Sequence, residues 1–225
     1  MVVESQKLKA SGGADQTRAA LVRAALILFG EQGFEGTSTR EIAAAANANI
    51  GSIAYHFGSK EGLRIAVADH IVATIQAIAS RNEAEAVKEV PASQDASLAI
   101  TAMIERMFSF FVVQQEAAEI VPFVLREMAA PSPAFERIYA GMIEPIHKRC
   151  CDLWEAATGE PAGSEETRIN VFTVMGQIIY FRLAREAVRR RMGWADIDFE
   201  HGAKISKAIT SNVADILAAK KERTS

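Results

Sequence analysis

Small polar and cationic side chains gather in two short runs near the N-terminus. The first run is Ser38-Thr39-Arg40, and the second begins at Asn49 and ends at His56. Hydroxyl, amide and guanidinium groups recognise phosphate oxygens and base edges through hydrogen bonds, without making or breaking covalent bonds. The two runs therefore predict recognition of a nucleic acid rather than catalysis.

The elements that would position these runs are short helices. From Thr17 onward, apolar residues recur on one helix face, and Gly33 is placed to end that helix. Ser38 and Glu41 have the spacing of a capping box, in which the two side chains satisfy free backbone N–H groups at a helix start. A second helix is therefore expected to begin at Ser38.

A tight turn should lead from the second helix into a third. Asn47 lies at this turn, and asparagine tolerates the left-handed backbone conformation better than most residues. Asn49 is expected to cap the third helix, over about residues 50–56, and Ser59 to cap the next one. Two short helices joined in this way, with small polar residues at the start of the second, can enter the DNA major groove, which is roughly 12 Å wide.

Three stretches, 37–43, 49–57 and 59–63, together resemble the DNA-binding domain of TetR-type repressors. The resemblance implies that one group of side chains holds phosphates: Ser38, Thr39, Arg40 and Lys60. It also implies that a second group lies in or along the groove: Asn49, Ile50, Gly51, Ser52, Tyr55 and His56.

The chain departs from this family pattern at two positions. Glycine is usual where this chain has Asn47, and an aromatic residue is frequent where it has Ala54, so the individual base contacts stay undefined. The alternative interpretation is a capped helical corner within a core, in which Tyr55 and His56 are ordinary surface residues.

Helical periodicity continues to the C-terminus. Further helices are expected over about 60–83, 94–113, 116–129, 133–158, 165–191 and 199–219, separated by Pro91, Pro131, the 159–163 turn and Gly193. The alternation of apolar and polar residues that is typical of strands does not occur, so the predicted fold is all-α with about nine helices. We expect a flexible arm over 1–16, a DNA-binding domain over 17–63, and a ligand-binding and dimerisation domain over 64–225.

The second half of the chain resembles the YbiH/CecR-like branch of TetR regulators, through Leu125-Arg126-Glu127-Met128, Pro131-Ser132-Pro133-Ala134-Phe135, Glu144-Pro145-Ile146-His147 and Arg191-Met192-Gly193-Trp194. The resemblance implies dimerisation through the last two long helices. The residues themselves agree, because helix 165–191 is apolar on almost every side and the last helix adds one apolar stripe.

An isologous four-helix interface is therefore expected between two copies of the chain. Its predicted residues are Val171, Met175, Gly176, Ile179, Ile209, Val213 and Ile216. A glycine in mid-helix, as at Gly176, fits a close approach of two backbones, and a substitution without any role explains it equally well.

Large, adaptable apolar side chains predict a cavity for an apolar or aromatic ligand, although each of them alone also fits an ordinary core. The apolar members are Met107, Phe108, Phe111, Phe123, Met142 and Trp154. The polar anchors are Arg126, His147 and Gln177, with Glu144 and Arg182 as further candidates. Pro145 is expected to bend its helix and to leave the Gly141 carbonyl unpaired.

Composition excludes several other classes of protein. Of 225 residues, 49% are hydrophobic and 24% charged, and the net charge is -3, so any DNA contact must come from a local surface. Neither a signal peptide nor an apolar stretch near the roughly 18 residues of a membrane span is seen, so a cytoplasmic protein without a membrane partner is expected. Glu144, His147, Cys150 and Cys151 partly share a helix face, but no second cluster accompanies them, and neither a metal nor a cofactor is expected.

An enzyme is the main rival class. The sequence has neither a glycine-rich phosphate loop nor a His-Glu-x-x-His zinc motif, so no catalysis is expected. The expected function is that of a homodimeric repressor, bound to double-stranded palindromic DNA and released by a small apolar or aromatic effector. The alternative is a DNA-binding dimer that a protein partner controls, or that activates transcription, without small-molecule induction.

Overall fold

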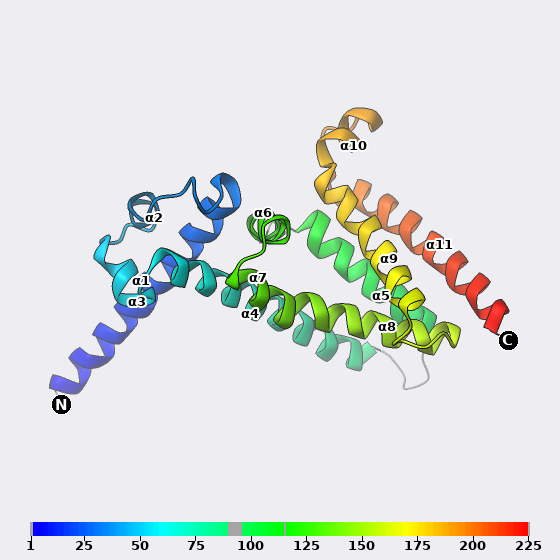
Figure 1. Ribbon diagram of the computed structural model, residues 1–225, viewed down its shortest axis with the longest axis horizontal. Coiled ribbons are helices and arrows are strands. Elements are labelled where there is room, and N and C mark those ends of the chain that lie inside the picture. Colours follow the sequence, from blue (N-terminus) through cyan, green and yellow to red (C-terminus); the bar gives the residue numbers. More distant parts are fainter. Residues whose placement is uncertain (1, 90–95, 115, 225) are drawn as a thin grey trace. The chain divides into compact units, whose positions relative to one another are not determined.

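The computed structural model describes residues 2–89, 96–114 and 116–224. Every regular element in these ranges is a helix, which confirms the all-α prediction (Figure 1). The helices, with η marking π-helical turns, are α1 (Val2–Gln32), α2 (Thr39–Ala45), α3 (Gly51–Phe57), α4 (Lys60–Glu89), α5 (Ala96–Phe108), η1 (Ser109–Val113), α6 (Glu116–Ala129), α7 (Pro133–Ile138), η2 (Tyr139–Ile143), α8 (Glu144–Thr158), α9 (Glu165–Leu183), α10 (Arg185–Met192) and α11 (Phe199–Thr224).

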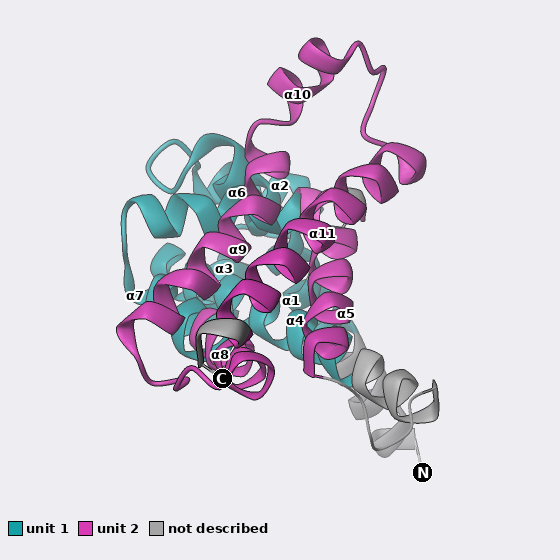
Figure 2. Cartoon of the chain, turned by 90° about the vertical axis from the view of Figure 1, so that its right-hand side faces the viewer, with its two compact units in different colours: residues 1–80, 119–142 teal, residues 81–118, 143–225 magenta. Residues whose placement is uncertain are grey.

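The chain forms two compact units, coloured separately in Figure 2. The first unit contains residues 1–80 and 119–142, and the second contains residues 81–118 and 143–225. The boundary expected between residues 63 and 64 falls inside α4, and most of α6 together with α7 joins the N-terminal helices. The break expected at Pro91 lies outside the described residues.

Helix α1 is longer than its apolar stripe. It begins at Val2, so the stretch 2–16, part of the segment expected to be a flexible arm, is helical. Its second half is fixed by packing, since Leu21, Ala25 and Phe29 are buried. Once such a segment is fixed, each further helical residue costs far less than starting a new helix, which explains the extension across Gly12 and Gly13.

Helix α4 provides much of the core of the first unit. Leu63, Val67 and Ile71 lie on one face and are fully buried. Contrary to the expectation from sequence, the stretch Lys60–Ser80 is long and apolar enough to cross a membrane, judged by length and composition alone. A core helix of a globular protein meets the same criterion, and the buried face of α4 fits that explanation.

The helix expected over 133–158 is divided into α7, η2 and α8. Pro145 lies in the first turn of α8, where its missing N–H has no intrahelical partner in any case. The Gly141 carbonyl, expected to be unpaired, accepts a hydrogen bond from Gln76 Nε2 of α4 at 3.3 Å. The effect of the proline is therefore absorbed by a π-helical turn and by a side chain from another helix.

In the second unit, α5, α8, α9 and α11 enclose one apolar core. Trp154 and Ile178 are almost fully buried there, and α11 contributes a stripe with a spacing of four residues: Ile205, Ile209, Val213 and Leu217. The helix expected over 165–191 ends at Leu183, and α10 follows it as a separate short helix.

Candidate DNA interface and effector cavity

The start of α2 has the predicted capping box. The backbone N–H of Glu41 donates to Ser38 Oγ at 3.2 Å, and the backbone N–H of Ser38 donates to Glu41 Oε2 at 2.7 Å. Hydrogen bonds from the hydroxyl and the backbone of Ser38 hold the pKa of Glu41 below its usual value. The Ser38 side chain is thus committed to the helix start, while Arg40 is exposed.

The turn before α3 is set by two asparagines. Asn47 has φ of 50°, which confirms the left-handed conformation expected there. Asn49 Oδ1 accepts a hydrogen bond from Gly51 N at 2.8 Å, and Ile50 occupies the N-cap position, one residue later than predicted. The side-chain oxygen of Asn49 therefore stabilises the helix start.

One face of α3 is buried and the opposite one is open. Ile53 is buried, whereas Tyr55 is 82% exposed and Ile50 is 51% exposed. The rings of Tyr55 and His56 meet edge to face, with centroids 4.9 Å apart. Gly51 is exposed, and Ser52 and His56 are partly exposed. A short helix with large exposed side chains beside small ones is suited to enter a groove.

Lys60 begins α4 and lies above an aromatic ring. Its Nζ is 4.2 Å from the centroid of Phe34, and the guanidinium of Arg64 lies over the same ring at 4.5 Å. Ser59 caps this helix as expected, because its Oγ accepts from Gly62 N at 3.0 Å. Lys60 was expected to hold a phosphate, and the structure places it beside Phe34 at the edge of the helix-turn-helix.

Position 62 requires glycine, and this requirement was not predicted from the sequence. A Cβ built on Gly62 would lie 2.0 Å from the Phe57 carbonyl oxygen, far inside van der Waals contact. Only glycine lets α4 begin so close to the end of α3. The sequence did contain a signal for this requirement: a glycine stands near the start of a helix, although alanine stabilises a helix by about 1 kcal/mol more.

Arg126 fastens α6 to α1. Its Nε donates to the Gly30 carbonyl at 2.8 Å, and its Nη2 donates to the Glu31 carbonyl at 2.7 Å. These carbonyls end α1, where no intrahelical donor remains and a cation is favoured. The two helices also touch closely, since a Cβ on Gly30 would lie 3.2 Å from the backbone nitrogen of Phe123.

A buried ion pair fastens α6 to α4. Glu127 is 2% exposed, and its Oε1 accepts from Arg64 Nε at 2.7 Å. The Ser132 hydroxyl donates to its second oxygen, Oε2, at 2.6 Å. This pair and Arg126 hold α6 in the unit that contains α2 and α3. The sequence did not predict this attachment of α6.

A cavity lies in the core of the second unit. The empty space here amounts to about 380 Å³ when the open solvent at its mouth is included, so the enclosed part is much smaller, and the lining is Ile100, Met103, Ile104, Met107, Cys150, Leu153, Trp154, Val171, Val174, Met175 and Ile178. Its lining side chains carry no charge at neutral pH: burial raises the pKa of the Cys150 thiol to about 12, and the Trp154 indole N–H already donates to Glu160 Oε2 at 2.9 Å.

Two of the predicted ligand residues, Met107 and Trp154, line this cavity. Phe108 and Phe111 belong to the surrounding core. Phe123, Arg126 and Met142 belong to the first unit and do not line this cavity. Neither His147 nor Gln177 is in the lining.

His147 has partners of its own. It stacks on Phe172 with centroids 4.0 Å apart, and its Nε2 lies 3.2 Å from the Arg168 carbonyl oxygen. The polar anchors predicted from the sequence are thus engaged elsewhere or placed away from the cavity. Among the described residues, no three His, Cys, Asp or Glu side chains come together.

Helix α9 has an apolar face that is largely exposed, although His147 stacks on one of its members, Phe172. Its large side chains are 54–59% exposed, and together with Gly176 they recur every three or four residues: Ile169, Phe172, Tyr180 and Leu183. Gly176 lies among them, with nothing within 4 Å of a Cβ built on it.

Most of the predicted dimer residues lie on the other side of these helices. Val171, Ile209 and Val213 are buried in the core of the second unit, and Met175, Ile179 and Ile216 are half-buried. Only Gly176 among the seven is exposed. Because α9 is apolar all round, its periodicity could not separate the inner face from the outer one.

Comparison with known families agrees with both halves of the chain. Residues 21–67 match the family described as "Bacterial regulatory proteins, tetR family". Residues 96–220 match the family described as "HTH-type transcriptional dual regulator CecR, C-terminal domain".

Known sequences and structures are similar along most of the chain. It is 32% identical over 213 residues to the HTH-type transcriptional dual regulator CecR of Shigella flexneri, covering 93% of this chain and 95% of that protein. It is 29% identical over 150 residues to the HTH-type transcriptional repressor NicS of Pseudomonas putida, covering 67% and 60%. The fold matches a transcriptional regulator from Rhodococcus sp. Rha1 (TM-score 0.63, 17% identity, 91% and 97% covered). It also matches AibR in complex with isovaleryl coenzyme A and operator DNA (TM-score 0.58, 16% identity, 86% and 96% covered).

Proposed function

Because this chain belongs to the TetR family of DNA-binding transcriptional regulators, in its CecR-like branch, we propose that it is a homodimeric repressor which a small uncharged ligand releases from a palindromic operator. The proposal rests on one observation: the chain has both exposed side chains on α3, in the first unit, and an apolar cavity in the second unit. The DNA partner also leads us to place the protein in the cytoplasm, together with the chromosome.

In this proposal α3 reads the major groove. Tyr55 and Ile50 are exposed enough to reach the DNA, while Gly51 and Ser52 let the helix approach the base edges. Arg40 and Lys60 contact phosphates on either side. The cation–π contact of Lys60 does not oppose this role, since such contacts are worth about 0.5–1 kcal/mol at exposed sites.

Arg40→Ala and Lys60→Ala are each expected to weaken binding to every duplex and to lower the slope of log affinity against log salt by about 1, because each removes one phosphate contact. Ser52→Ala is expected to reduce discrimination between operator and random DNA, with a smaller loss of overall affinity. Fluorescence anisotropy at several salt concentrations measures both quantities. Lys148→Ala, which removes an exposed cation from α8, is the control, and unchanged binding by the first three variants would refute the proposed interface.

The proposed dimer joins through the exposed apolar face of α9 and the outer face of α11. Large apolar side chains exposed along one stripe normally need a partner. The exposed side of α11 carries small residues that permit close packing: Ala203, Ala208, Ser211, Ala214, Ala218 and Ala219. A two-fold interface of this kind would space two α3 helices for the half-sites of a palindrome.

The cavity is connected to both dimer helices by an ion-pair network. Trp154 lines the cavity and donates to Glu160, and Glu160 pairs with Lys220 of α11 at 2.9 Å. Lys220 also pairs with Glu166, at the start of α9. A ligand that turns Trp154 would thus disturb the contacts that hold α9 and α11 together at this end. The complex of AibR with an acyl thioester and operator DNA supports ligand control in this fold.

A neutral aromatic probe tests the cavity. We expect Nile red to bind and to lower operator affinity about tenfold, which corresponds to about 1.4 kcal/mol of coupling. Met107→Trp should abolish both effects by filling the cavity, while operator binding without the dye persists and reports correct folding. Met128→Trp, at an exposed site of the first unit, is the matched control. A Met107→Trp variant that responds like the parent protein would place the ligand elsewhere.

A second candidate function is activation in addition to repression. The relative from Shigella flexneri is named a dual regulator, which favours this possibility. Transcription in vitro from promoters with the operator at different positions distinguishes the two functions, since a pure repressor lowers transcript yield at every position.

A further inference from the structure

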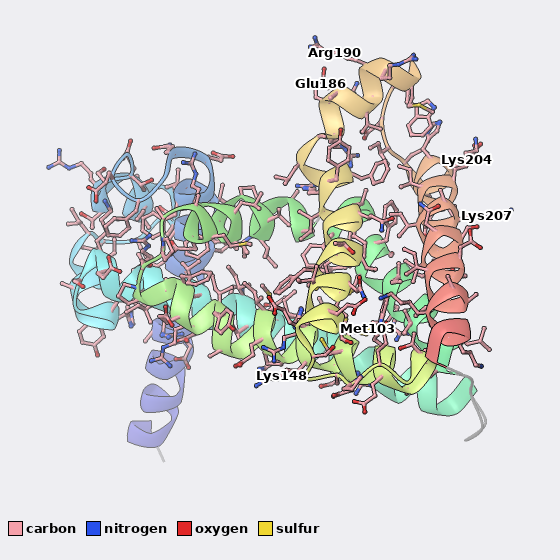
Figure 3. All side chains as sticks on the ribbon, turned by 45° about the vertical axis from the view of Figure 1, so that its right-hand side comes forward. Met103, Lys148, Glu186, Arg190, Lys204 and Lys207 are labelled. Carbon is pink, nitrogen blue, oxygen red and sulfur yellow. The ribbon has the colours of Figure 1, made fainter. Side chains whose placement is uncertain are left out.

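Four residues with sulfur-containing side chains line the cavity of the second unit. They come from three helices: Met103 and Met107 from α5, Cys150 from α8 and Met175 from α9. Met103 and Met107 are four residues apart and therefore share one face of α5. Figure 3 marks Met103 within the helical body of this unit. The remaining lining residues are aliphatic, apart from Trp154.

Two of these sulfurs already lie at a distance that suits a shared ion. Cys150 Sγ is 3.8 Å from Met103 Sδ. Protein metal–sulfur bonds are about 2.3 Å long, so two sulfurs on one ion with trigonal or tetrahedral angles lie roughly 3.8–4.0 Å apart. An ion between Cys150 and Met103 would need little movement of either helix.

The donor set selects the kind of ion. Thiolate and thioether ligands favour soft ions such as Cu(I), whereas Mg²⁺, Ca²⁺ and Mn²⁺ prefer oxygen. Neither a carboxylate nor an imidazole is in the lining. Charge also favours a monovalent ion over a divalent one, because one thiolate neutralises a monovalent ion completely. A divalent ion would leave a net charge in an apolar cavity, which is unfavourable.

We propose that the cluster of Cys150, Met103, Met107 and Met175 binds one Cu(I) ion. As the copper–sulfur bond to Cys150 forms, the thiol proton leaves to solvent, and the three thioethers bind as neutral donors. No electron is transferred, since copper arrives and stays as Cu(I). This inference goes beyond the proposed function, and its test uses no DNA, so each can fail without the other.

The test is an anaerobic titration of the full-length reduced protein with Cu(I), in competition with the chromophoric chelator bathocuproine disulfonate. One Cu(I) per chain is expected. Cys150→Ser should lower the affinity more than about 100-fold, beyond the loss typical of changes outside the ligand shell. Met103→Leu conserves the side-chain volume and should keep the fold. It should lower the Cu(I) affinity about tenfold, because a neutral thioether contributes less than the thiolate.

Two matched variants control for general effects. Cys151→Ser changes the neighbouring buried thiol, which points to His147 instead of Met103, and Met128→Leu changes an exposed methionine of the first unit. Both should bind Cu(I) like the parent protein, and X-ray absorption should show sulfur ligands alone. Equal losses for Cys150→Ser and Cys151→Ser, full binding by Cys150→Ser, or nitrogen or oxygen ligands at the copper would each overturn the proposal.

Discussion

Phe172→Glu combined with Tyr180→Glu is expected to convert the proposed dimer into a monomer and to lower its affinity for a palindromic operator by roughly 10²–10⁴, the gain that linked binding of two sites provides. Both side chains are more than half exposed on α9, even with Phe172 stacked on His147. Pairing two copies across this face would bring the new carboxylates together in an apolar contact, where they would be desolvated and repel one another. Light scattering measures the mass, and anisotropy measures operator binding.

The control for this variant is Leu98→Glu, which introduces the same charge at a similarly exposed apolar residue of α5. It should remain dimeric. The double variant should keep its affinity for a single half-site, because α2 and α3 are unchanged. A double variant that stays dimeric at micromolar concentration would show that the subunits meet through another surface.

Glu127→Ala is expected to destabilise the first unit by about 3–5 kcal/mol, the usual cost of removing one partner of a buried ion pair. The carboxylate is almost fully buried, and its loss leaves Arg64 Nε and the Ser132 hydroxyl without their acceptor, while Arg64 Nη1 keeps its more distant ion pair with Glu61. In a chain of this length, such a loss lowers the melting temperature by roughly 6–20 °C. Thermal unfolding followed by circular dichroism measures it.

An exposed ion pair between α1 and α6 serves as the control for the buried pair of Glu127 and Arg64. Arg23 and Glu119 join α1 to α6 at 3.0 Å, with the arginine side chain 72% exposed, so Glu119→Ala should destabilise the protein far less than Glu127→Ala. If Glu127→Ala were no more destabilising than Glu119→Ala, the inference that Glu127 fastens α6 to α4 would be wrong.

Features set by neighbours in the sequence were predicted well. The capping box of Ser38 and Glu41, the left-handed Asn47 and the helix end at Gly33 each depend on residues within about one helical turn. Such local interactions need only the right residue types at the right spacing. For this reason the helix-turn-helix, and with it the candidate DNA interface, could be located from the sequence.

Features set by distant contacts could not be predicted. Arg126 was expected in the ligand cavity, yet its partners are carbonyls at the end of α1, 95 and 96 residues away. Phe123 and Met142 fit an apolar cavity by residue type, but the fold places them in the first unit. An apolar residue type predicts that a side chain will be buried. Only the packing of the helices determines which residues surround it.

The sequence by itself determined an all-α DNA-binding regulator, because helix periodicity, capping and the residues of the helix-turn-helix motif are local properties of the chain. Only the tertiary structure decided which side of α9 faces outward, since Val171 and Phe172 are adjacent and equally apolar, yet one is buried and the other is 54% exposed. The same applies to Cys150 and Met103, which are 47 residues apart in the chain and meet only when α8 packs on α5. The physical reason is that apolar burial has no direction of its own, so the assembled helices alone determine which surfaces remain for a partner or a ligand.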